Sequence, residues 1–62
     1  LGDRVTQCSN MISDFYKMGV KYNNPGMITL SQTVRDYAVP SLKAKGVKQA
    51  YFYQILREKG VR

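Results

Sequence analysis

The sequence predicts a small all-α domain of three helices, and three observations point to it. Apolar residues recur at spacings of three and four near the start of the chain, and a capping signal precedes a second apolar series. A segment that ends in Gly-Val occurs twice in the last third. With 62 residues the chain is expected to form one domain, residues 1–62, with a fragment of a longer protein as an open alternative.

The first helix is predicted over Asp3–Met18. Its buried stripe consists of residues spaced by three, four and three: Val5, Cys8, Ile12 and Phe15. Met11 and Met18 are expected to widen this stripe as core residues that fill gaps. Gly19 is expected to end the helix in the left-handed conformation, with Val20 packing behind it.

The segment after the first helix contains a strong turn signal, Asn23–Gly26, between two short apolar pieces. Val20–Tyr22 and Met27–Thr29 suit either a short β-hairpin or a plain loop, because an isolated two-stranded ribbon is only marginally stable. Both alternatives remain open from the sequence.

The second helical segment is predicted to begin at a capping box, Thr29–Gln32, in which the Thr hydroxyl and the Gln side chain bond the free amides of the first turn. Leu30, Val34 and Tyr37 continue it at helical spacing. Pro40 is expected to break or kink this helix, so that a new short helix runs over Pro40–Lys45.

The repeated segment predicts how the last two helices end. Leu42–Lys48 recurs fourteen residues later as Leu56–Arg62, and in each the Gly suits a left-handed helix end with the following Val packed on the Leu. The terminal helix is therefore predicted from about Lys48 to Lys59. Its core side chains are expected at three positions: Phe52, Ile55 and Leu56.

The charge of the chain is strongly positive and uneven. The formal net charge is +6. Residues 1–39 carry four cations against three acids, whereas residues 40–62 carry six cations against Glu58 alone. A polyanionic partner is therefore expected, with the second half of the chain as its contact surface.

Several function classes are poor fits to the composition. The chain has no His and a single Cys, so neither a His-based catalytic triad nor a His/Cys zinc site can be assembled within it. It also has no apolar run of the length that spans a bilayer. We therefore expect a non-enzymatic, intracellular protein of the cytoplasm, nucleoid or nucleus, with no cofactor, metal, membrane or small-molecule substrate.

Residues 46–57, Gly-Val-Lys-Gln-Ala-Tyr-Phe-Tyr-Gln-Ile-Leu-Arg, resemble the turn and recognition helix of helix-turn-helix proteins, including the DNA-binding domains of resolvase and invertase recombinases. The resemblance implies a helix-turn-helix over residues 30–59, whose last helix enters the DNA major groove. It assigns structural roles to five residues: Gly46, Val47, Phe52, Ile55 and Leu56. The sequence departs from this family at Lys48, where Ser or Thr is usual, at Lys45, which replaces an apolar residue, and at Pro40.

The expected function is sequence-specific binding of duplex DNA, as a regulator or accessory factor. Gln can pair with adenine and Arg with guanine, whereas Lys and Tyr serve phosphates. The expected DNA contacts are Lys43, Lys45, Lys48, Gln49, Tyr53, Gln54, Arg57 and Arg62. Because one module is small, specificity would need a homodimer or tethered domains.

Two alternatives remain open. One is an RNA-binding or ribonucleoprotein component in which Tyr51 or Tyr53 stacks on bases, and the other is a helical module whose basic face meets an acidic protein.

Overall fold

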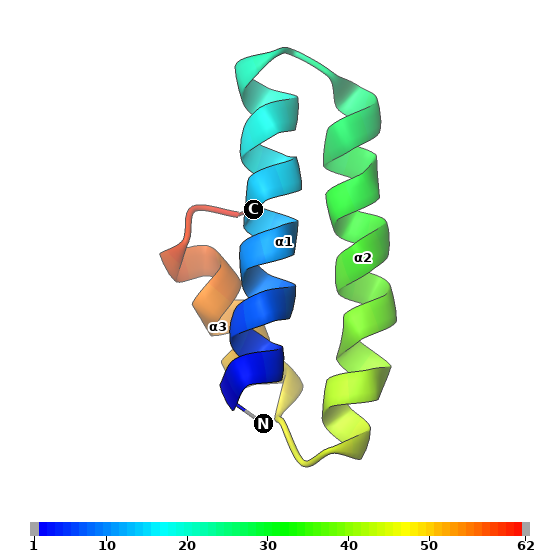
Figure 1. Cartoon of the computed structure of the whole chain (residues 1–62), viewed down its shortest axis with the longest axis vertical. Coiled ribbons are helices and arrows are strands. Elements are labelled where there is room, and N and C mark those ends of the chain that lie inside the picture. The colour runs from blue at the N-terminus through cyan, green and yellow to red at the C-terminus, as the bar shows by residue number, and fades with distance from the viewer. Residues whose placement is uncertain (1, 62) are drawn as a thin grey trace.

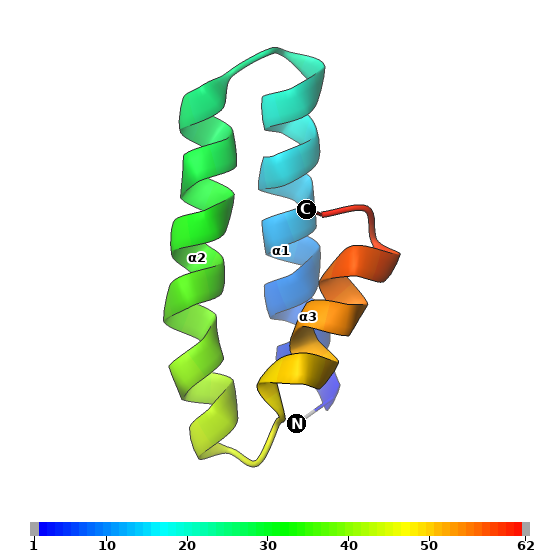
Figure 2. The same cartoon turned by 180° about the vertical axis from the view of Figure 1, so that it is seen from behind.

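The computed structural model describes residues 2–61 and shows a small all-α fold of three helices (Figure 1). They are α1 (Gly2–Lys21), α2 (Pro25–Ala44) and α3 (Gln49–Glu58). α1 and α2 form a long antiparallel pair, and α3 lies against the half of that pair that contains the start of α1 and the end of α2 (Figures 1 and 2). The predicted all-α class is confirmed, and residues 2–61 contain no strand.

The prediction that Gly19 ends the first helix is wrong. α1 continues through Gly19 to Lys21, and Asn23, with φ of 51°, adopts the left-handed conformation instead. Gly19 is buried where α1 meets α2, so its missing side chain allows close packing against Ile28. Val20, which was expected to pack behind the helix end, is exposed.

α2 begins earlier than predicted, because the turn residues themselves start the helix. Asn24 is the N-cap, and its Oδ1 accepts a hydrogen bond of 3.1 Å from the N–H of Gly26. Pro25 follows at the first helical position, where the lack of an N–H costs nothing. The hairpin alternative and the capping box at Thr29–Gln32 are therefore wrong, since Met27–Thr29 and the residues after it lie inside α2.

Pro40 does not end α2, which continues unbroken to Ala44. The ring removes one backbone donor from the helix interior, and Pro40 is exposed at the helix surface. Buried Ala38 and Leu42 on either side of it hold both parts of α2 against the core. The predicted separate helix over Pro40–Lys45 is therefore absent.

The hydrophobic core joins all three helices and the chain end that follows α3. Its buried members are Val5, Ile12, Ala38, Leu42, Phe52, Leu56 and Val61. The predicted burial of Phe52 and Leu56 is confirmed, while Ile55 is half-buried at the core edge.

The predicted stripe of α1 is buried only in part. Val5 and Ile12 are buried as predicted, whereas Cys8 and Phe15 are half-buried, and the two residues expected to widen the stripe, Met11 and Met18, are exposed. Ser9 and Ser13 are buried in their place, and the hydroxyl of Ser9 donates a hydrogen bond of 3.1 Å to the carbonyl of Thr6. Ser9 borders a groove together with Val47 and Ile55, so small side chains occupy part of the buried side of α1.

The turn between α2 and α3 confirms the predicted helix end at Gly46. Gly46 has φ of 91°, and its N–H donates to the carbonyl of Lys43 at 3.1 Å. The N–H of Val47 donates to the carbonyl of Leu42 at 2.9 Å, which completes a Schellman motif.

The second repeat ends α3 in the same way. Gly60 has φ of 89°, and the N–H of Val61 donates to the carbonyl of Leu56 at 3.0 Å. Val61 is buried in the core, so this motif fixes the end of α3 against the rest of the domain.

Replacing Gly19 by Ala is expected to destabilise the domain by about 1–3 kcal/mol. A Cβ at this position would lie 2.6 Å from Cγ1 of Ile28 and 2.9 Å from its backbone nitrogen, so the helices would have to separate. Urea unfolding measures the change, with Val20→Ala at the exposed neighbouring position as control. Helix propensity alone predicts a gain of about 1 kcal/mol for Gly19→Ala, and such a gain would contradict the close packing.

Truncating Phe52 to Ala is expected to lower stability by about 3–5 kcal/mol, because its ring is 1% exposed and fills the core. The matched control is Tyr51→Ala, which removes a neighbouring aromatic ring that is 55% exposed and should change stability by about 1 kcal/mol or less. Thermal melts of both variants provide the comparison. Equal losses for the two would show that the register of α3 is wrong.

Candidate nucleic-acid interface

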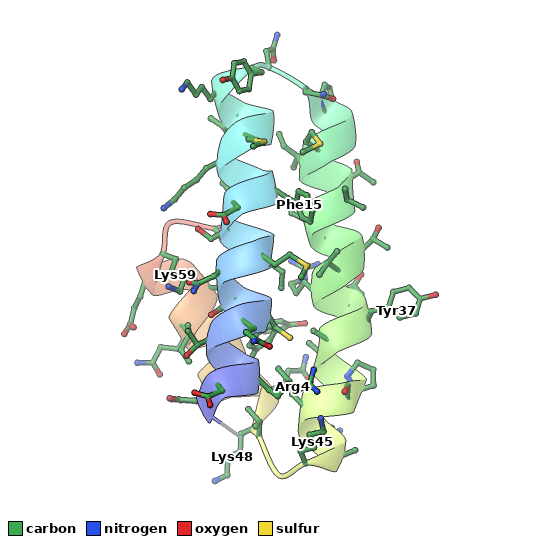
Figure 3. The ribbon with its side chains drawn as sticks, viewed as in Figure 1. Arg4, Phe15, Tyr37, Lys45, Lys48 and Lys59 are labelled. Atoms are coloured by element: carbon green, nitrogen blue, oxygen red, sulfur yellow. The ribbon has the colours of Figure 1, made fainter. Side chains whose placement is uncertain are left out.

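Cations from three parts of the chain gather at one end of the domain. Lys43 lies in the last turn of α2, Lys45 and Lys48 lie in the connection to α3, and Arg4 lies near the start of α1. Figure 3 shows Arg4, Lys45 and Lys48 at the same end of the molecule. We call these four exposed residues the basic end.

Arg4 was missed by the sequence analysis, which assigned the first half of the chain to support. Because α1 and α2 are antiparallel, the start of α1 lies beside the end of α2 (Figure 1). This pairing adds Arg4 to Lys43, Lys45 and Lys48, all of which the sequence predicted to be contact residues.

The N-terminus of α3 opens at the basic end. Lys48 is the N-cap residue with extended backbone (φ −75°, ψ 137°), and its side chain makes no capping hydrogen bond, as expected of a group that cannot accept one. The N–H groups of the first turn are therefore not bonded by the N-cap side chain, and the helix dipole places partial positive charge there. Lys48, Gln49 and the helix end together favour an anionic partner.

The predicted contact residues of α3 do not form one uniform face. Gln49, Gln54 and Arg57 are exposed, whereas Tyr53 is half-buried. The Nε2 atom of Gln54 lies 3.5 Å from Oε1 of Glu58, at the far limit of a hydrogen bond. The carboxylate of Glu58 therefore lies beside Gln54, which makes this pair less favourable to an anion than the first turn of α3.

Tyr53 is held by two neighbours. Its ring centroid lies 6.4 Å from that of Phe52, and the guanidinium carbon of Arg35 lies 5.7 Å from its centroid. Arg35 was also missed by the sequence analysis, since only the packing of α2 against α3 brings it to Tyr53. Arg62, the last of the predicted contacts, lies outside the described residues.

Residues 2–61 contain no group of three His, Cys, Asp or Glu side chains that could hold a metal ion. None of the three helices has both the length and the apolar character needed to cross a membrane.

Comparison with family models, curated proteins and solved structures found no match to this chain. The resemblance to recombinase DNA-binding domains therefore depends on residues 46–57 alone. The class that the fold and the charges define is a small three-helix domain with a basic end at the start of its last helix.

Replacing Lys48 by Ser is expected to raise stability by about 1 kcal/mol, because a Ser hydroxyl can accept a hydrogen bond from the first turn of α3. Lys45→Ser is the matched control, since it removes the same charge from the neighbouring C-cap of α2, where no such bond is available. Thermal melts distinguish the two variants. Equal gains would mean that relief of charge repulsion, and not capping, is responsible.

Proposed function

We propose that this chain binds duplex DNA through the first turns of α3, as a regulator or an accessory DNA-binding factor. The observation that carries the proposal is the meeting of the basic end with the uncapped N-terminus of α3. Lys and Arg side chains there neutralise phosphates and release counterions, which supplies affinity for any sequence.

The dimensions of α3 suit this role. Ten residues span about 15 Å, and a helix of this kind fits a major groove about 12 Å wide. Gln49 at the start of α3 can pair with adenine, and Gln54, five residues later, is also exposed. Each good pairing contributes about 1–3 kcal/mol of discrimination between bases.

The surface of one such domain is limited. The domain measures 35 × 19 × 17 Å, and a single small module contacts only part of a binding site. Selection of one target sequence would therefore require a second copy or a tethered domain.

One observation favours binding of single-stranded nucleic acid instead. Tyr51 is 55% exposed and lines a shallow groove that also contains Lys48 and Lys59. An exposed aromatic ring between cations can stack on an unpaired base while the lysines hold its phosphates.

Fluorescence anisotropy against mixed-sequence duplex DNA and single-stranded RNA, each over a salt series, tests the proposal. We expect tighter binding to the duplex, with a log–log salt slope that corresponds to roughly 3–6 phosphates. Lys48→Gln should weaken duplex binding, whereas Lys21→Gln at the opposite end of the α1–α2 pair should not.

Two other outcomes would overturn the duplex proposal. Stronger RNA binding that is lost in Tyr51→Ala would favour the single-stranded alternative. Absence of binding to both nucleic acids would leave the basic end for an acidic protein partner.

A further inference from the structure

A groove runs between α2 and α3, away from the first turn of α3. Its volume is about 780 Å³, within the range of ligand-binding clefts. We call it the arginine groove, and its lining residues are Arg35, Tyr53, Leu56, Arg57, Gly60 and Val61. Two guanidinium groups from different helices thus border one cleft that has no carboxylate in its lining.

Arg35 is held in position by a series of contacts that reaches the core. Its guanidinium lies over the ring of Tyr53, and that ring packs beside Phe52, which is fully buried. The side chain of Arg35 is 28% exposed, so part of it remains open to a ligand. A cation fixed in this way loses little conformational entropy when it binds an anion.

Asp36 is the one competing acid that contacts Arg35 among the described residues. Its Oδ1 lies 3.3 Å from Nε of Arg35, and its side chain is 66% exposed. An exposed pair of this kind contributes little to stability and uses only one edge of the guanidinium. The terminal nitrogens of Arg35 have no hydrogen-bond partner within residues 2–61.

We propose that the arginine groove binds the sugar–phosphate backbone of a nucleic acid, which rests on the function proposed above. Arg35 and Arg57 bond the phosphate oxygens, since planar guanidinium groups match phosphate geometry. The ring of Tyr53 and the side chains of Leu56 and Val61 offer an apolar surface for the attached sugar.

This assignment changes the role of Arg57. As an exposed α3 residue it was expected to distinguish bases, but in the arginine groove it contacts the backbone together with Arg35. Contacts with phosphates position a protein on the duplex and carry no sequence information directly. The reading of bases is then left to Gln49 and Gln54.

The first experiment compares Arg35→Gln with Lys21→Gln in duplex binding over a salt series. The variants are matched, because each removes one positive charge that lies over a Tyr ring: Arg35 at 5.7 Å from Tyr53 and Lys21 at 5.4 Å from Tyr22. Arg35→Gln is expected to lower the salt slope by about 1 and to weaken binding to all sequences by a similar factor. Lys21→Gln is expected to leave the slope unchanged.

Arg35→Lys keeps the charge without the planar group and should give intermediate affinity. A thermal melt shows whether Arg35→Gln folds. If it does not, Arg35→Lys serves as the test variant in its place. If the wild type binds duplex DNA and all three variants keep its slope and affinity, the arginine groove is not a backbone site and the proposed function stands.

The second experiment needs no duplex binding. The Nε–H signals of Arg35 and Arg57 are followed by NMR while thymidine 5′-monophosphate or thymidine is added. We expect shifts with the nucleotide and none with the nucleoside, which lacks the phosphate. If the wild type binds no nucleic acid, the proposed function is wrong. Absence of shifts with the nucleotide would overturn the proposal that the arginine groove binds a phosphate.

Discussion

The close approach of α1 to α2 is the constraint on which the rest of the structure depends. Gly19 and Ser31 supply little volume at the buried contact, so the two helices approach closely at these positions. Ser31 satisfies its hydroxyl by donating to the carbonyl of Ile28 at 2.6 Å, and its burial leaves no unpaired group. The α1–α2 pair formed in this way provides the surface against which Phe52 and Leu56 of α3 pack. The position of α3 in turn decides which cations meet at the basic end and in the arginine groove.

Local rules of helix stability are broken in one short stretch of the chain. Pro40 occupies a helix interior, and Lys48 occupies an N-cap position that it cannot satisfy. Pro40 lies in the last two turns of α2 and Lys48 lies just before α3, on either side of Lys45. Residues that reduce stability commonly concentrate where a protein meets its ligand, since their selection serves binding. The proposed interface gives this clustering a physical reason.

The parts of the fold that depend on neighbouring residues could be predicted from the sequence, and the parts that depend on distant residues could not. Gly46 and Gly60 were assigned correctly because a left-handed helix end needs only a glycine and the residues around it. Asn24 and Pro25 are typical both of a turn and of a helix start. The sequence alone favoured a turn, whereas these residues begin α2. Arg35 reaches Tyr53 only through the packing of α2 on α3. Its place in a candidate site therefore has no sequence signal.

α3 packs against only one half of the α1–α2 pair, so the two halves of the pair are held by different contacts. Near the connection between α1 and α2, α3 does not cover the two helices, and Met18 and Leu30 are 50% and 40% exposed there. Local opening costs least where few apolar contacts must be broken. Opening of that half is therefore resisted mainly by the close contact of Gly19 with Ile28, whereas Phe52 and Val61 hold α3 at the other half. The contacts that resist opening at one end of the molecule are in this way separate from those that hold the last helix at the other.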